Sequence, residues 1–316
     1  MQVFDGENQA QPVRSTTPLT TIHPRVAALG AVAEGHCEIE LPAGRSRVRI
    51  ERGPEYTPVD IDLETTPGAV VERTVRLRRW IHMAARGWWS GDLHVHRAPS
   101  EMSALMQASD LHLAPTITRW NDNSSLDSWP EQTVLSAGPQ RAYSIDNCED
   151  ERGWGAALFF GVKSPLKLYS LKTQRQYPPP LPIWREARQK GAMIDLEKAI
   201  WWGAPVIAAL SPPDTIGVAV NHFLEGGVLD TEAWGRPRDK EKYAGAGGFA
   251  QYIFDLYYCY LNCGRRFPAS AGSANGVIHS PLGYNRSYVF LGRHFSFDDW
   301  LAGQKAGRNF VTNGPM

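Results

Sequence analysis

The stretch Gly91-Asp92-Leu93-His94-Val95-His96-Arg97-Ala98-Pro99-Ser100 combines a short apolar run with a helix start directly behind it. The run predicts a strand over residues 92–96, and Ser100 just after Pro99 predicts the N-cap of a helix. A second apolar run predicts another strand over residues 111–118. A strand, a helix and a second strand in succession are typical of a β/α architecture with parallel strands.

The same alternation of helices and strands continues toward the C-terminus. A helix that ends at Gly191 precedes a strand over residues 192–196, which places Glu197 at the carboxyl end of that strand. A strand-like run over residues 215–220 leads in the same way to His222. Enzymes built on β/α barrels gather their chemistry at the carboxyl ends of their strands, so both residues are candidates for a site.

Residues 30–87 follow a different pattern, in which apolar and polar residues alternate in short runs separated by Pro and Gly. Such alternation predicts strands with one buried face, here a small antiparallel β-sandwich domain. We therefore expect an α/β protein with an N-terminal extension over residues 1–29, the β-sandwich over 30–87 and a β/α domain over 88–316. The sandwich strands are expected around residues 37–41, 48–50, 59–63 and 75–77.

The composition limits the classes of partner. The chain has 316 residues, of which 42% are hydrophobic, and this suffices for a large core. The 33 basic and 33 acidic residues cancel, so no global field draws the chain to nucleic acid or to an anionic membrane. The N-terminus lacks a signal-peptide pattern and no stretch approaches membrane-spanning length. We expect a soluble protein, either cytoplasmic or exported with its signal removed, that acts on a small molecule.

His94 and His96 are two residues apart on the expected strand, so their side chains project from the same face. Two imidazoles that converge in this way can chelate one divalent ion, and the alternative is a pair of ordinary surface or core histidines. Asp92 beside them can orient an imidazole by accepting a hydrogen bond from it. We therefore predict a metal site that begins with this pair.

Further ligands are expected at the ends of other strands. Glu197 and His222 meet this condition, and the alternative for Glu197 is an ion pair with Lys198. The run Glu149-Asp150-Glu151 comes before an apolar strand and is either a solvated turn or a source of one ligand, with Glu151 preferred. The predicted ligands of one or two zinc, manganese or iron ions are His94, His96, Glu151, Glu197 and His222.

Lys198 is a candidate catalytic residue, because a cation beside a metal-bound carboxylate can stabilise an oxyanion or donate a proton to a leaving oxygen. Glu197 and Glu151 are the other catalytic candidates. The residues expected to bind the substrate are Arg97, Trp120, Asn121, Trp201, Asn221 and Arg286. The chain has no Gly-x-Ser-x-Gly nucleophile motif and no phosphate-binding loop with its lysine, and we expect no organic cofactor.

Several longer motifs follow one another along the chain, at residues 41–45, 52–56, 91–97, 150–153, 195–198, 221–222, 269–273, 283–286 and 306–315. In these motifs the chain resembles the CehA/McbA family of metallohydrolases, a carbaryl-hydrolase-like branch related to the PHP (polymerase and histidinol phosphatase) domain. The resemblance implies a PHP-like distorted seven-stranded β/α barrel with one to three divalent metals at its carboxyl mouth. It also implies hydrolysis of a carbamate ester, or phosphoester cleavage as in PHP relatives.

The chain departs from the usual PHP pattern in two motifs. Arg119-Trp120-Asn121 stands where a PHP chain has Asp-His-Asn, and the segment 272–276 stands where a late Asp-x-His is usual. At least three usual ligands are absent, so the resemblance implies a reduced metal site. Relatives commonly continue into another β domain, so we expect the sequence, which stops at Met316, to be truncated relative to them.

Three functions are compatible with these features. The first is a metal-dependent hydrolase that uses metal-activated water on an ester, carbamate or amide bond of a small, largely uncharged substrate. The second is a PHP-type phosphoesterase, which needs more cationic groups near the metal. The third is a catalytically degraded carbohydrate-binding protein. The oligomeric state is open.

Overall fold

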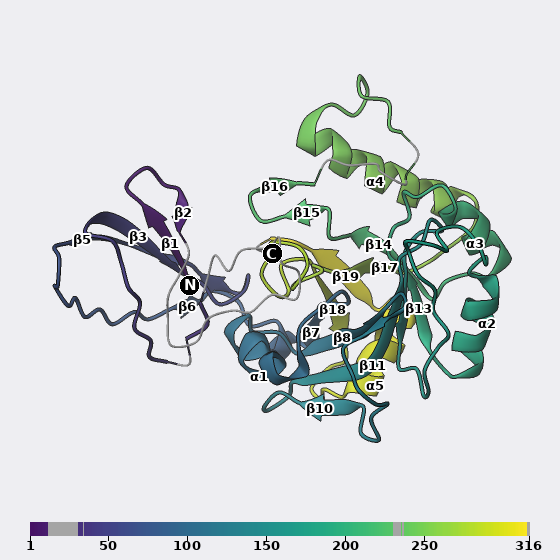
Figure 1. The fold of residues 1–316 in the computed structure, drawn as a ribbon, viewed down its shortest axis with the longest axis horizontal. Coiled ribbons are helices and arrows are strands. Elements are labelled where there is room, and N and C mark those ends of the chain that lie inside the picture. Colours follow the sequence, from purple (N-terminus) through teal and green to yellow (C-terminus); the bar gives the residue numbers. More distant parts are fainter. Residues whose placement is uncertain (12–30, 34, 230–234, 236, 315–316) are drawn as a thin grey trace.

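The computed structural model describes residues 1–11, 31–33, 35–229, 235 and 237–314, so most of the expected extension over residues 1–29 lies outside the described residues. In Figure 1 a small antiparallel sheet projects from one side of a larger mixed sheet that is surrounded by helices. The protein is α/β, with a nearly closed, barrel-like mixed sheet and a few small antiparallel sheets.

The small sheet has the strand order β2-β1-β3-β5. Its bounds are β1 Gln2–Asp5, β2 Ala10–Gln11, β3 Gly44–Ile50 and β5 Val59–Thr65. β3 and β5 pair along their whole lengths, and Val3 packs with Ala31 and Val48 in a small core. β1 is therefore part of this sheet, although its residues were expected in an extension, because Val3 gives that short strand a buried side chain.

The strands expected at residues 37–41 and 75–77 do not form, apart from a single bridge residue at Ile39. Residues 66–74 are exposed, and residues 75–77, which follow them with an alternating apolar pattern, pair with no neighbouring strand. Instead, β6 (Arg78–Arg79) pairs with β4 (Tyr56–Thr57), and neither contributes to the small core around Val3. Within the described residues this region is a single-layer sheet with a short ribbon, not a β-sandwich.

The large sheet has the order β17-β14-β13-β12-β11-β8-β7-β18-β19, with β9 added to β8 and β10 to β11. On this path β12 and β18 run opposite to the other strands. The bounds are β7 Trp88–Gly91, β8 Leu113–Trp120, β9 Asn123–Ser124, β10 Val134–Ser136, β11 Ala142–Asp150, β12 Ala157–Phe160, β13 Met193–Leu196, β14 Thr215–Ala219, β17 Ala269–Ala271, β18 Arg286–Phe290 and β19 Asn309–Thr312. A separate hairpin joins β15 Phe223–Leu224 to β16 Gly227–Val228.

Contacts between the ends of this path nearly close the sheet. The backbone N–H of Leu93, just after β7, donates to the carbonyl of Ala271 at 3.0 Å. Nδ2 of Asn309 in β19 donates to the carbonyl of Ala269 in β17 at 2.7 Å. We call the carboxyl ends of β7, β8, β11, β13 and β14 the barrel mouth.

An apolar cluster fills much of the barrel interior below the mouth. Trp300 of α5 (Phe297–Lys305) is fully buried there, and its Nε1 donates to the carbonyl of Trp89 at 2.7 Å. Inward side chains alternate with outward ones, as the strand period of two requires. On β12, for example, Leu158 faces the interior cluster with Trp300, whereas Phe159 faces the helices.

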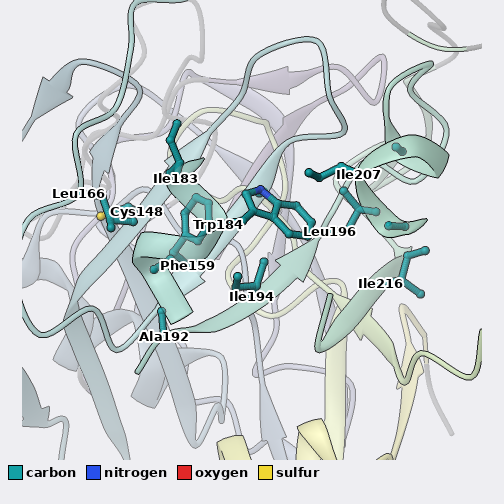
Figure 2. Close-up of a cluster of buried hydrophobic side chains, with 14 of the residues drawn as sticks. Cys148, Phe159, Leu166, Ile183, Trp184, Ala192, Ile194, Leu196, Ile207 and Ile216 are labelled. Carbon is teal, nitrogen blue, oxygen red and sulfur yellow. The ribbon is translucent and has the colours of Figure 1, made fainter. Parts of the chain in front are cut away.

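Helices cover the outside of the sheet: α1 Pro99–Ala108, α2 Leu181–Gln189, α3 Ala204–Leu210 and α4 Gly245–Asn262, with the short helix η1 at Ala84–Arg86. Figure 2 shows Trp184 of α2 packed against Phe159 and Leu196, which explains the amphipathic sequence of that helix. None of the described helices combines the length and the apolar character needed to span a membrane.

The expected strand over residues 92–96 is displaced, because β7 ends at Gly91. The carboxylate of Asp92 accepts backbone N–H groups of His94 at 3.1 Å and Ser273 at 3.0 Å, and these bonds replace a regular ladder. Similarly, α1 has Ala98 at its N-cap and Pro99 at its first turn, so Ser100 is not the cap. The histidine pair therefore lies directly beyond a strand rather than within it.

Candidate metal centre

His94, His96 and Glu149 meet at the barrel mouth, where the first two follow β7 and the third lies near the end of β11. Nε2 of His94 is 3.0 Å from Nε2 of His96. Oε2 of Glu149 is 3.1 Å from Nε2 of His96 and 3.5 Å from Nε2 of His94. All three side chains are at most 2% exposed.

These three separations fit the coordination shell of one ion. Zinc binds imidazole nitrogen and carboxylate oxygen at about 2.0–2.2 Å, so neighbouring ligands at angles of about 90–109° lie about 2.8–3.6 Å apart. Oε2 of Glu149 is buried and accepts no hydrogen bond, which leaves it available as a ligand. Among the described residues this is the one group that brings three such ligand atoms within 4.8 Å of one another.

Glu197 lies on the other side of the His94 ring. Its Oε1 is 3.2 Å from Nδ1 of His94, close enough to orient the imidazole although the pair lies outside hydrogen-bond geometry. Its Oε2 accepts a hydrogen bond from Nζ of Lys198, which is also buried. Glu197 thus contacts His94 and forms the ion pair with Lys198 that was considered as the alternative for it, and it lies outside the three-atom group.

The pKa values within this cluster reflect burial and opposite charges. Burial alone disfavours the charge of Glu197, yet Lys198 and His94 hold the pKa of its carboxyl at about 2. The pKa of Glu149 is likewise lowered, because His94 and His96 outweigh burial. Burial lowers the pKa of His94, but Glu149 and Glu197 overcome this and raise it to about 10. An ion that binds Nε2 of His94 would therefore take the place of a proton.

Glu151, the preferred ligand of the acidic run, lies beside the cluster rather than in the three-atom group. Its Oε2 accepts the Nε1–H of Trp120 at 2.9 Å, and its backbone N–H donates to Oδ1 of Asn121 at 2.8 Å. Burial and the neighbouring Glu149 raise its pKa to about 7. Glu149 instead faces the histidines, because β11 continues through Asp150 and sets Glu149 opposite the inward Leu158 of β12.

His222 follows β14 at the barrel mouth but lies outside the three-atom group. Its ring stacks on Phe249 of α4 with centroids 5.4 Å apart, and its Nδ1 is 2.9 Å from the carbonyl of Leu229. Neighbouring Asn221 is nearer to the cluster, because its backbone N–H donates to Oε1 of Glu197 at 3.4 Å. Oδ1 of Asn221 is buried without a hydrogen-bond partner, so it remains a candidate to meet a donor on a ligand.

The residues expected to bind substrate separate into two groups. Trp120 and Asn121 lie with Asn221 beside the cluster, and the Trp120 ring is 4.9 Å from that of His96. The other three have structural contacts: Arg97 donates to Asn275, Arg286 to the carbonyls of Gly283 and Ser109, and Trp201 packs in the apolar cluster with Phe249.

Asp195, which sequence reasoning did not single out, lies on β13 two residues before Glu197 and therefore on the same face. Its Oδ1 accepts hydrogen bonds from Oγ1 of Thr215 at 2.6 Å and Oγ of Ser270 at 2.5 Å. Burial raises its pKa to about 6. The strand period over Met193, Asp195 and Glu197 was the available signal that this carboxylate faces the interior.

In comparisons with known proteins, no family model, curated protein or solved structure matches the chain. The function of this site is therefore inferred from its geometry.

Proposed function

We propose that the protein is a metal-dependent hydrolase that cleaves an ester, carbamate or amide bond of a small, largely uncharged substrate with water. The observation that carries the proposal is the set of separations of 3.0, 3.1 and 3.5 Å among Nε2 of His94, Nε2 of His96 and Oε2 of Glu149. Two imidazole nitrogens and one carboxylate oxygen suit zinc, manganese or iron and leave positions open for water and substrate. A divalent ion in such a site supplies activated water and polarises a carbonyl group.

The residues around the group would serve the reaction in separate ways. Glu151 lies next to Glu149 with a pKa raised to about 7, which suits a group that accepts a proton from attacking water near neutral pH. Lys198 offers a buried ammonium that can donate to the negatively charged oxygen that develops when water attacks the carbonyl group. Trp120 would provide an apolar wall above His96.

The resemblance to the CehA/McbA family and the PHP-like barrel belong to this same proposal. Two observations support them: the barrel-like mixed sheet and a His-x-His pair directly beyond one of its strands. The phosphoester alternative has less support, because Nε of Arg97 donates to Asn275 and Nε and Nη2 of Arg286 donate to backbone carbonyls, although Nη1 of each is buried without a hydrogen-bond partner. Cationic groups are what a phosphoryl substrate would require.

Metal analysis and a panel of chromogenic substrates test the proposal. Purified wild-type protein should contain a transition metal and hydrolyse an aryl ester, an aryl carbamate or an anilide, with activity lost to a chelator and restored by Zn²⁺, Mn²⁺ or Fe²⁺. The double variant His94→Ala, His96→Ala should lose both metal and activity.

The matched control removes two histidines that are exposed, in the variant His36→Ala, His82→Ala, and should keep both properties. A wild-type protein that binds none of these metals would contradict the proposal. Cleavage of aryl phosphates alone would replace it with the phosphoesterase, and sugar binding without metal would favour the carbohydrate-binding alternative.

A further inference from the structure

The buried ammonium of Lys198 lies among three glutamates at the barrel mouth. Its Nζ donates to Oε2 of Glu197, and it also interacts electrostatically with Glu149 and Glu151. Its side chain is 3% exposed, so water screens these charges little.

The backbone holds Lys198 in this position. Its N–H donates to the carbonyl of Gly155 at 2.7 Å, and its carbonyl accepts the N–H of Trp201 at 3.1 Å. The first bond ties the residue to the loop before β12, and the second closes the turn that precedes α3. The lysine is thus a fixed part of the site rather than a mobile surface charge.

The formal charges in this group balance with one divalent ion. Glu149, Glu151 and Glu197 supply three negative charges, Lys198 supplies one positive charge, and one ion supplies two more. A second ion would leave an excess of two positive charges in a buried site, which is costly. The sum covers the glutamates that act on Lys198: Asp150 is paired with Arg152, and Asp195 accepts hydrogen bonds from the hydroxyls of Thr215 and Ser270.

The coordination geometry also favours a single metal ion. Glu197 contacts the three-atom group through the His94 ring, but its Oε2 is taken by Lys198 and its Oε1 faces Nδ1 of His94. We propose that the Lys198 ammonium takes the place of a second metal ion, so that the site holds a single divalent ion. This inference rests on the proposed metal-dependent function and defines how that site is built.

Loading the apo protein with Mn²⁺ tests the inference without measuring activity. Equilibrium dialysis should show one Mn²⁺ per wild-type chain in excess metal, and the bound ion should give the six-line electron paramagnetic resonance spectrum of an isolated centre. Lys198→Met, which keeps the length of the side chain and removes its charge, should bind a second Mn²⁺ and show the multiline spectrum of an exchange-coupled pair.

The matched control is Lys242→Met, which removes a lysine that is 61% exposed, and it should bind one ion. If Lys198→Met does not fold, as judged by circular dichroism, Lys198→Leu replaces it, because its shorter apolar side chain also removes the charge and leaves Oε2 of Glu197 without the lysine donor. Two ions in the wild-type protein, or one ion in a folded variant that lacks the lysine charge, would overturn the inference and leave the hydrolase proposal standing. No bound Mn²⁺, Zn²⁺ or Fe²⁺ in the wild type would overturn the hydrolase proposal itself.

Discussion

Oε1 of Glu197 lies 3.2 Å from Nδ1 of His94, while Nε2 of the same ring lies 3.5 Å from Oε2 of Glu149. The imidazole therefore stands between two carboxylates, one on each ring nitrogen. In metal sites a carboxylate behind a histidine fixes the orientation of its ring and increases its basicity. In the proposed metal site, Glu197 would therefore act through His94 without binding the ion directly.

Glu197→Gln should weaken binding of the divalent ion by about 10–100-fold, because the amide orients His94 less strongly than a carboxylate does. Competition with a chromogenic chelator measures this affinity. Glu186→Gln, which changes a half-buried glutamate on α2 that pairs with Lys190, serves as the control and should bind the ion as the wild type does. An unchanged affinity in Glu197→Gln would show that Glu197 does not act on His94.

Glu151→Gln should lower kcat by about 10²–10⁴-fold while the protein retains its bound ion, because the variant loses a proton acceptor but no ligand. Parallel metal analysis and kinetics on the best aryl substrate separate the two properties. Glu149→Gln is the informative comparison and should lose the ion. If Glu151→Gln loses the ion as well, Glu151 is a ligand, as the sequence alone suggested.

His112 should make the fold less stable in acid. Burial lowers its pKa to about 3, and its Nδ1 lies 2.9 Å from Oγ of Ser90. In the unfolded chain His112 takes up a proton near pH 6.5, whereas in the folded protein it stays neutral until the pH is near 3. The free energy of unfolding is therefore highest above pH 6.5 and declines as the pH falls toward 3. The slope from this one residue is at most about 1.4 kcal/mol per pH unit.

Urea unfolding at several pH values measures the slope for His112. The variant His112→Asn keeps an acceptor near Ser90 and does not titrate, so its unfolding free energy should depend less on pH between 6.5 and 4 than that of the wild type. Equal pH dependence in the two proteins would show that His112 does not resist protonation in the fold.

Gly91→Ala should destabilise the barrel by about 1–3 kcal/mol, because overpacking a filled core forces side chains to move. A Cβ at this position would lie 2.4 Å from the ring of Trp300. Gly247→Ala in α4 has open space and should be neutral or slightly stabilising. Denaturant unfolding compares the two, and a Gly91→Ala variant as stable as the wild type would show that Trp300 does not fill the interior in this way.

Several elements of the barrel could be predicted because their sequences are continuously apolar. The strands expected at 111–118, 192–196 and 215–220 correspond to β8, β13 and β14 with small shifts in their bounds. In a barrel whose strands are covered on both sides, such runs are what burial requires. The positions of Glu197 and His222 beyond their strands followed correctly from these predictions.

β11 was missed because its sequence, Ala-Tyr-Ser-Ile-Asp-Asn-Cys-Glu-Asp, has no apolar run. Its polar side chains are buried by tertiary contacts: Nδ2 of Asn147, for example, donates to the carbonyl of Thr116 on the neighbouring strand at 2.9 Å. Local sequence carries no information about such a partner. The sequence also did not show that β12 runs antiparallel to its neighbours. Without β11 and the direction of β12, the sequence could not show that Glu149, rather than Glu151, faces the histidines.

A crystal structure of the protein loaded with Zn²⁺ or Mn²⁺, with the ion located by anomalous scattering, would show whether His94, His96 and Glu149 bind one metal ion together. We expect one ion per chain, within about 2.0–2.2 Å of Nε2 of His94, Nε2 of His96 and Oε2 of Glu149. An ion bound elsewhere, or a fully loaded crystal with no ion between these three atoms, would contradict it.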